Sequence, residues 1–159
     1  AFGDAAAKLR ESGLDRVVIE QARAGKPLLG ICLGMQLLFE KSFEYGEHEG
    51  LGLIKGEIVP LLGEIKSDLK IPHMGWNALK FTENETPIFK NIKNGDHVYF
   101  VHSYQAYCDD CNISAYSEYP DKVPALVYDG GFVYGAQFHP EKSGKTGLAI
   151  LKNFGGLIK

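Results

Sequence analysis

Apolar residues in the first quarter of the chain recur at two different spacings. Positions three and four apart are typical of helices with one packed face, and short unbroken apolar runs are typical of buried parallel strands. By these rules the sequence predicts, in order, helices over 4–12 and 15–24, a strand over 27–32 and a helix over 35–41. Asp4 is the expected N-cap of the first helix, and Gly13 and Gly25 are the expected stops of the first two.

The rest of the chain has a different pattern. From Gly46 to Gly63 it is glycine-rich, with short apolar pieces around Leu53 and Ile58. Segments rich in β-branched and aromatic residues then predict strands over 98–104, 113–119, 124–129 and 131–138, followed by a helix over 145–158. The sequence Asp-Gly-Gly at 129–131 predicts a hairpin turn. This mixture predicts an α/β domain with a parallel core and an antiparallel extension.

Composition narrows the class of protein. A chain of 159 residues with 45% hydrophobic content is suited to one domain with its own core. A formal charge of −3 gives no basic footprint for nucleic acid or an anionic membrane. No apolar stretch approaches the roughly 20 residues that span a bilayer. Three cysteines, an odd number, indicate a reducing compartment, so the cytoplasm is the expected location.

Candidate chemistry begins with GICLG at 30–34, which matches the G-x-nucleophile-x-G turn between a strand and a helix. Both glycines are expected because larger side chains would collide within such a turn. The turn would place Cys32 at a helix N-terminus, which favours a thiolate, and would aim the N–H of Leu33 at a developing oxyanion. The pentapeptide alone nevertheless fits a buried structural cysteine better than a nucleophile.

A thiolate nucleophile needs a base, and the base needs an orienting group. The segment QFHPE at 137–141 contains both residue types, as His139 and Glu141. If the extended conformation continues past the strand, both side chains point the same way, and Glu141 can hold one ring nitrogen while the other faces Cys32. A histidine beside a proline is by itself more often an ordinary loop residue. Its occurrence together with GICLG favours catalysis.

Five segments carry a resemblance to a known family: PLLGICLGMQLLFEKS, GLGLIKG, IPHMGWN, VYFVHSY and YGAQFHPEKSG. The first and last resemble the class I (triad) glutamine amidotransferases. HMGWN and VHSY together are similar to the branch that serves histidine biosynthesis, the glutaminase subunits of imidazole glycerol phosphate synthase. The resemblance implies a flavodoxin-like three-layer α/β fold over residues 1–159, with no cofactor and no metal.

The resemblance also assigns roles to single residues. It implies that Cys32, His139 and Glu141 form a triad that hydrolyses glutamine through a γ-glutamyl thioester. Residues matching contacts to substrate glutamine are Gln36, Glu44, Ser103 and Tyr104. Residues matching a partner interface are Trp76, Asn77, Tyr99 and Lys142. The implied partner is a (β/α)₈-barrel cyclase that takes up the ammonia and forms imidazole glycerol phosphate and an aminoimidazole carboxamide ribotide.

Competing interpretations remain for several residues. A lone Trp76 is more often ordinary core filling, Glu40 is more often part of a solvated helix face, and His102 is expected to be structural. The C-x-x-C at 108–111 lacks a second ligand pair and precedes a strand, so it is expected to be a turn rather than a zinc or redox site. GLGLIKG lacks the nucleotide-binding glycine pattern.

The alternatives for the whole protein are a glutaminase for another amination, such as amidino-sugar synthesis, and a non-catalytic binding subunit. The triad alone does not separate these. Members of the family begin with a strand–helix–strand unit and a Pro-Gly-rich segment that frames the oxyanion side of the glutamine pocket. The chain as written is expected to lack that unit, and therefore to hydrolyse little or no glutamine by itself.

Overall fold

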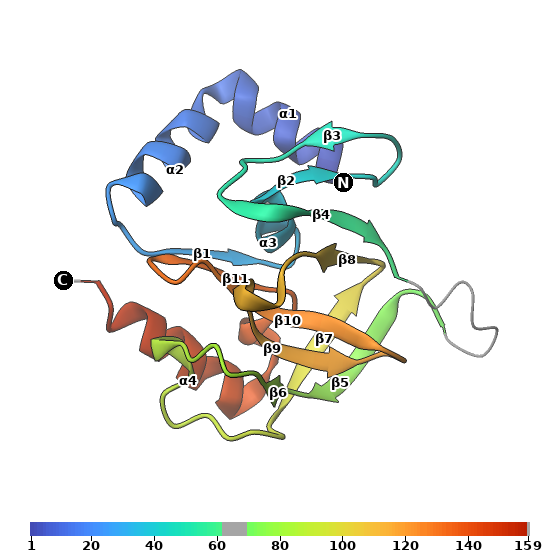
Figure 1. The fold of residues 1–159 in the computed structure, drawn as a ribbon, viewed down its shortest axis with the longest axis vertical. Helices are drawn as coiled ribbons and strands as arrows, with labels where there is room; N and C mark the ends of the chain where they lie inside the picture. Colours follow the sequence, from blue (N-terminus) through green and yellow to red (C-terminus); the bar gives the residue numbers. More distant parts are fainter. Residues whose placement is uncertain (62–69, 159) are drawn as a thin grey trace.

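The computed structural model describes residues 1–61 and 70–158, and within them a mixed sheet lies between two layers of helices (Figure 1). The helices α1 and α2 lie on one side of strand β1, and α4 lies on the other side. The predicted end of the glycine-rich stretch, at Gly63, falls outside the described residues.

The long helices follow the predicted pattern closely. They are α1 (Phe2–Ser12), α2 (Leu14–Arg23) and α4 (Gly144–Gly155). Gly13 ends α1 in the left-handed conformation, with φ 75°, and its N–H bonds to the carbonyl of Arg10, so the predicted stop is confirmed. The predicted cap is wrong, because α1 begins earlier and Asp4 lies inside its first turn.

A five-stranded sheet forms the centre of the molecule, in the order β1-β11-β10-β9-β6. Its strands are β1 (Leu28–Ile31), β6 (Lys80–Phe81), β9 (Ile113–Glu118), β10 (Lys122–Tyr128) and β11 (Val133–Ala136). The pair β1–β11 is parallel and the other pairs are antiparallel. The predicted hairpin is present between β10 and β11, where Asp129 Oδ1 accepts the N–H of Gly131 at 2.8 Å.

Two smaller sheets flank the centre. One has the order β3-β2-β4-β8, with β2 (Phe39–Ser42), β3 (His48–Glu49), β4 (Ile54–Pro60) and β8 (Tyr104–Tyr107). The other pairs β5 (His73–Ala78) with β7 (His97–His102). The predicted strand over 98–104 is therefore divided at Ser103 between two sheets.

The predicted helix over 35–41 is wrong in its second half. Helix α3 covers only Leu33–Leu37, and β2 begins at Phe39. The carbonyls of Leu38 and Phe39, which a longer helix would use internally, instead accept N–H groups of the loop before β4. Tertiary pairing has thus overridden local helical periodicity.

Alternation along the central strands divides the interior into two cores. On β11, Val133 packs with α1 and α3, whereas the next residue, Tyr134, packs in the cluster that contains Ile150 of α4. Because successive strand residues point to opposite faces, the central sheet has an apolar layer on each side. This sandwich holds the carboxyl ends of β1 and β11 side by side.

Candidate active site

The turn after β1 bends the backbone at Cys32 into a conformation that few residues adopt, with φ 52° and ψ −106°. A Cβ added at Gly30 would lie 2.5 Å from the carbonyl oxygen of Gly34, so only glycine fits there. The same expectation is wrong for Gly34, where an added Cβ meets nothing within 4 Å. The strand and helix therefore approach most closely at Gly30.

The thiol of Cys32 is partly buried, and its sulfur lies 3.7 Å from the carbonyl oxygen of Val101 on β7. Burial raises the pKa of this thiol above its ordinary value. A hydrogen bond from the N–H of Leu33 acts in the opposite direction, and the nearby charges of Glu141 and Lys142 oppose each other. The sequence-based expectation of a favoured thiolate is therefore wrong for the resting site, because desolvation outweighs the N–H groups of the short helix α3.

Parallel pairing brings the second motif beside the first. Ile31 pairs with Ala136, and the N–H of Cys32 donates to the carbonyl of Ala136 at 2.7 Å. The N–H of His139, just beyond β11, donates to the carbonyl of Tyr99 at 2.9 Å. Cys32 and His139 thus contact positions two residues apart on β7, roughly 7 Å along that strand.

His139 and Glu141 form a close pair. The ring Nδ1 lies 2.9 Å from Oε1 and 3.3 Å from Oε2 of the carboxylate. The expected extended backbone is wrong, because Pro140–Lys142 form a 3-10 turn, η4, that folds the carboxylate back onto the ring. Since a carboxylate only accepts, Nδ1 carries a proton, and Nε2 is the ring nitrogen that Glu141 does not bond.

Ser143 fastens this turn to β7. Its hydroxyl donates to the carbonyl of His139 at 2.6 Å and accepts the N–H of Tyr99 at 2.9 Å. The backbone on both sides of the imidazole is therefore held to the same strand that contacts the Cys32 sulfur.

The residues expected at substrate glutamine occupy three different settings. Gln36 is buried, and its amide donates to the carbonyl of Tyr104 at 3.3 Å. Ser103 lies at the break between β7 and β8. Glu44 follows β2 and lies beside the first turn of α1, where its Oε1 accepts the N–H of Phe2 at 3.2 Å. The structure brings Gln36 and Tyr104 together and places Glu44 with α1 instead.

Comparison with known proteins identifies the family to which the chain belongs. A family model described as glutamine amidotransferase class-I matches residues 3–156, nearly the whole chain. The chain belongs to the class I glutamine amidotransferases. The elbow at Cys32 and the His139–Glu141 pair therefore lie inside a glutamine amidotransferase domain.

Relatives of this amidotransferase share about half of its sequence. The imidazole glycerol phosphate synthase subunit HisH of Caldanaerobacter subterraneus subsp. tengcongensis is 51% identical over 160 residues, covering 100% of this chain and 76% of that protein. The protein of the same name from Lactococcus lactis subsp. lactis is 50% identical, covering 97% of this chain and 74% of that one. Its counterpart in Listeria monocytogenes serotype 4b is 48% identical and is covered over 74% of its length.

Solved structures show the same amidotransferase fold at lower identity. The structure of PurLQS from Thermotoga maritima aligns with a TM-score of 0.68 at 22% identity, over 92% of this chain and 68% of that one. A glutamine amidotransferase from the same organism aligns with a TM-score of 0.60 at 16% identity, over 92% of this chain and 54% of that one. These likenesses show that the three-layer fold is that of the class I glutamine amidotransferases.

Two of the four residues expected at a partner interface lie side by side in the amidotransferase, and a third lies on a turn that contacts β7. Trp76 pairs with Tyr99 across β5 and β7, their rings 6.0 Å apart, and η4 carries Lys142 close by. Trp76 is 55% exposed, so it does not fill the core. Asn77 points to the opposite side of β5, where its amide donates to the carbonyl of Glu118 at 2.9 Å.

Gln137, which the sequence pattern did not single out, is fully buried beside the elbow. Its side-chain nitrogen lies 3.7 Å from the Cys32 sulfur and its oxygen lies 3.1 Å from the amide nitrogen of Gln36. A polar residue within the otherwise apolar run YGAQF was the available signal, because a buried amide requires partners.

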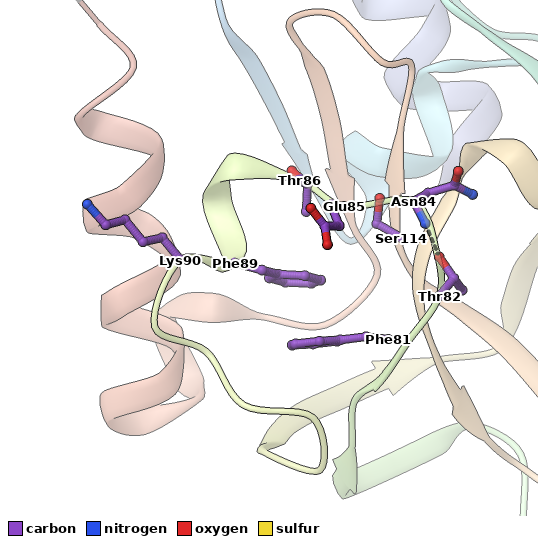
Figure 2. Close-up of a pocket in the computed structure, with 8 residues that line it drawn as sticks. All are labelled: Phe81, Thr82, Asn84, Glu85, Thr86, Phe89, Lys90 and Ser114. Atoms are coloured by element: carbon purple, nitrogen blue, oxygen red, sulfur yellow. Dashed lines mark hydrogen bonds between the residues drawn. The ribbon is translucent and has the colours of Figure 1, made fainter.

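The two larger cavities described for residues 1–61 and 70–158 lie away from the elbow. One, of about 270 Å³, is lined by residues around η2 (Pro87–Phe89) and contains none of the expected site residues (Figure 2). The other, of about 810 Å³, includes Cys108 and Cys111 near the 3-10 turn η3 (Asp110–Asn112). Within the part of the chain that the structure describes, no group of three or more His, Cys, Asp or Glu is arranged to hold a metal ion.

None of the helices described for residues 1–61 and 70–158 is both long and apolar enough to cross a membrane.

Proposed function

We propose that this amidotransferase is the glutaminase subunit of an imidazole glycerol phosphate synthase, and that it hydrolyses glutamine to glutamate and ammonia in histidine biosynthesis. One observation supports this proposed chemistry most directly. The strained turn at Cys32 and the His139–Glu141 pair leave adjacent parallel strands at the same end and dock on the same strand, β7.

In the proposed first step, Nε2 of His139 takes the proton of the Cys32 thiol, and the sulfur attacks the side-chain amide carbon of glutamine. Glu141 holds the ring orientation and stabilises the imidazolium that forms. The N–H of Leu33 donates to the developing oxyanion. Collapse of this intermediate breaks the carbon–nitrogen bond, and the proton on Nε2 passes to the leaving ammonia.

In the second step, water hydrolyses the γ-glutamyl thioester. Nε2 of His139 takes a proton from the water, whose oxygen bonds to the acyl carbon, and the carbon–sulfur bond breaks to release glutamate. The thiolate is then reprotonated. Burial of Cys32 raises its pKa, so the thiol form is favoured between turnovers.

The names of the relatives support the histidine branch over amidino-sugar synthesis or a non-catalytic role. We further propose a (β/α)₈-barrel cyclase as partner and the cytoplasm as location. The exposed Trp76 beside the half-buried Tyr99, with Lys142 on the turn η4 that contacts β7, supports a docking face, because tryptophan and tyrosine are typical anchors of interfaces.

The proposal predicts that Cys32→Ala, introduced into the full-length protein, abolishes glutamate release in the presence of the barrel partner, since the thioester forms on this sulfur. A glutamine-analogue chloroketone is expected to label Cys32 and to spare Cys108 and Cys111, as peptide mass spectrometry will show. Iodoacetamide is the control, because it tests whether the exposed thiol of Cys111 is available. Retained hydrolysis by Cys32→Ala would refute the triad assignment.

A further inference from the structure

A continuous path of side-chain hydrogen bonds runs from the backbone of Tyr104 to the Cys32 sulfur. The amide nitrogen of Gln36 lies 3.3 Å from the Tyr104 carbonyl oxygen and 3.1 Å from Oε1 of Gln137. Nε2 of Gln137 lies 3.7 Å from Sγ of Cys32. Both glutamines are almost fully buried, at 5% and 0% exposure, so water does not compete for these contacts.

The backbone end of the path fixes the direction of every link. A carbonyl oxygen only accepts, so Gln36 must turn its NH₂ group toward Tyr104. The same NH₂ group donates to the amide of Gln137, which must therefore present its oxygen. This leaves the NH₂ group of Gln137 facing the sulfur as a donor.

His102 strengthens the anchor of the path. Its Nδ1 lies 2.8 Å from the same Tyr104 carbonyl oxygen, so Nδ1 carries the proton. Its Nε2 then accepts from Nδ1 of His73 at 3.0 Å. Burial lowers the pKa of each histidine to about 4, so both are neutral at pH 7 and the anchor carries no charge.

On the basis of the proposed glutaminase function, we infer that Gln137 is a positioning residue of the reaction, which holds the Cys32 sulfur with its NH₂ group and holds Gln36 with its oxygen. A donor aimed at sulfur bonds more strongly to a thiolate than to a thiol, so this contact tightens as the proton leaves. The same residue therefore supports the nucleophile and an expected contact to substrate.

Several groups around Cys32 act on the ionisation of its thiol, and the Gln137 donor is one of them. Burial and the carboxylate of Glu141 oppose ionisation, whereas the N–H of Leu33, the ammonium of Lys142 and the amide of Gln137 favour it. His139 bonds to Glu141 through Nδ1, and His102 on β7 is neutral at pH 7. Loss of the Gln137 donor therefore removes one of the contacts that lower the pKa of Cys32, and the pKa is expected to rise.

The test is the pH dependence of Cys32 alkylation by iodoacetamide, followed in the full chain by peptide mass spectrometry. Gln137→Met keeps the length of the side chain and removes its donor and acceptor. We expect the pKa of Cys32 to rise and alkylation at pH 7 to fall roughly three- to tenfold. The rate at high pH, where the thiol is fully ionised, is expected to equal that of the wild type.

Gln105→Met is the matched control, because Gln105 is also a buried glutamine but lies on β8, where its backbone pairs with Val59. It is expected to leave the Cys32 profile unchanged. Gln137→Glu, which preserves shape and adds a negative charge, is the second variant if Gln137→Met does not fold. It is expected to raise the pKa of Cys32 further.

Wild-type alkylation profiles in the Gln137 variants would overturn the inference, even if glutamine turnover by the wild type stands. Conversely, glutamine hydrolysis by Cys32→Ala would overturn the proposed function and leave the alkylation result intact. The two failures are therefore distinguishable.

Discussion

At the scale of single residues, Thr86 and Ser114 are the clearest anomaly. Each buries a hydroxyl that finds no hydrogen-bond partner among the described residues. Both line the cavity of about 270 Å³, above the stacked rings of Phe81 and Phe89 (Figure 2). A buried hydroxyl without a partner costs free energy, because it has lost its bonds to water.

We therefore predict that Thr86→Val stabilises the protein by about 1 kcal/mol, since it replaces an unpaired hydroxyl with a methyl group of similar size. Urea unfolding measures the change. Thr82→Val is the matched control in the same cavity, because the Thr82 hydroxyl donates to the carbonyl of Ile113 and accepts the N–H of Asn84. That variant is expected to be destabilised. A less stable Thr86→Val protein would show that its hydroxyl has a partner.

At the scale of elements, the two glycines of the elbow make unequal contributions. We predict that Gly30→Ala destabilises the protein by about 1–3 kcal/mol and slows alkylation of Cys32, because its Cβ would press on the backbone of Gly34. Gly34→Ala is expected to change stability by less than about 1 kcal/mol, because space is open there and alanine favours helix. Equal effects of the two substitutions would contradict this account of the turn.

The elements also show which parts of the fold were predictable from sequence. Helix stops such as Gly13 and the hairpin at Asp129 depend on local chemistry, so the pattern predicted them. The pattern did not predict strand β2, because Phe39 bonds to the N–H of Gly52 and pairs with Ile54 of β4 instead of continuing the helix. Local periodicity carries no information about such a partner.

In the candidate site, too, some residues were predictable from local sequence and others were not. The local sequence indicated Cys32, His139 and Glu141, because each belongs to a short pattern with a chemical purpose. The sequence pattern did not indicate Gln137, because its role depends on contacts with Gln36 and with the sulfur of Cys32, which lies 105 residues earlier in the sequence. The role of Glu44 at substrate glutamine stays a prediction that rests on the resemblance, and in the structure its carboxylate accepts the N–H of Phe2.

At the scale of the whole molecule, the buried pair His73 and His102 links folding stability to pH. Burial lowers the pKa of both to about 4, whereas an unfolded histidine titrates near 6.5. Between these values the unfolded chain binds more protons, so the free energy of unfolding rises with pH. Stability is therefore expected to fall as pH is lowered from about 6.5 to about 4.

We predict that this loss reaches up to about 1.4 kcal/mol per pH unit for each histidine. His73→Phe is expected to flatten the dependence, because it removes one titrating group and keeps a ring between Phe100 and Tyr119. His97→Gln, at an exposed position of β7, is the control and is expected to leave the slope unchanged. Chemical unfolding at a series of pH values measures the slope, and an unaltered slope in His73→Phe would contradict the assignment.

The register of β1 against β11 has a consequence for how activity appears during folding. The four residue pairs from Leu28–Val133 to Ile31–Ala136 align the two ends from which the nucleophile and the base emerge. A slip of one residue would leave the covalent structure intact and turn the neighbouring side chains to opposite faces. The meeting of the nucleophile with its base is thus a product of the finished sheet, because a chain that pairs incorrectly does not bring Cys32 and His139 together.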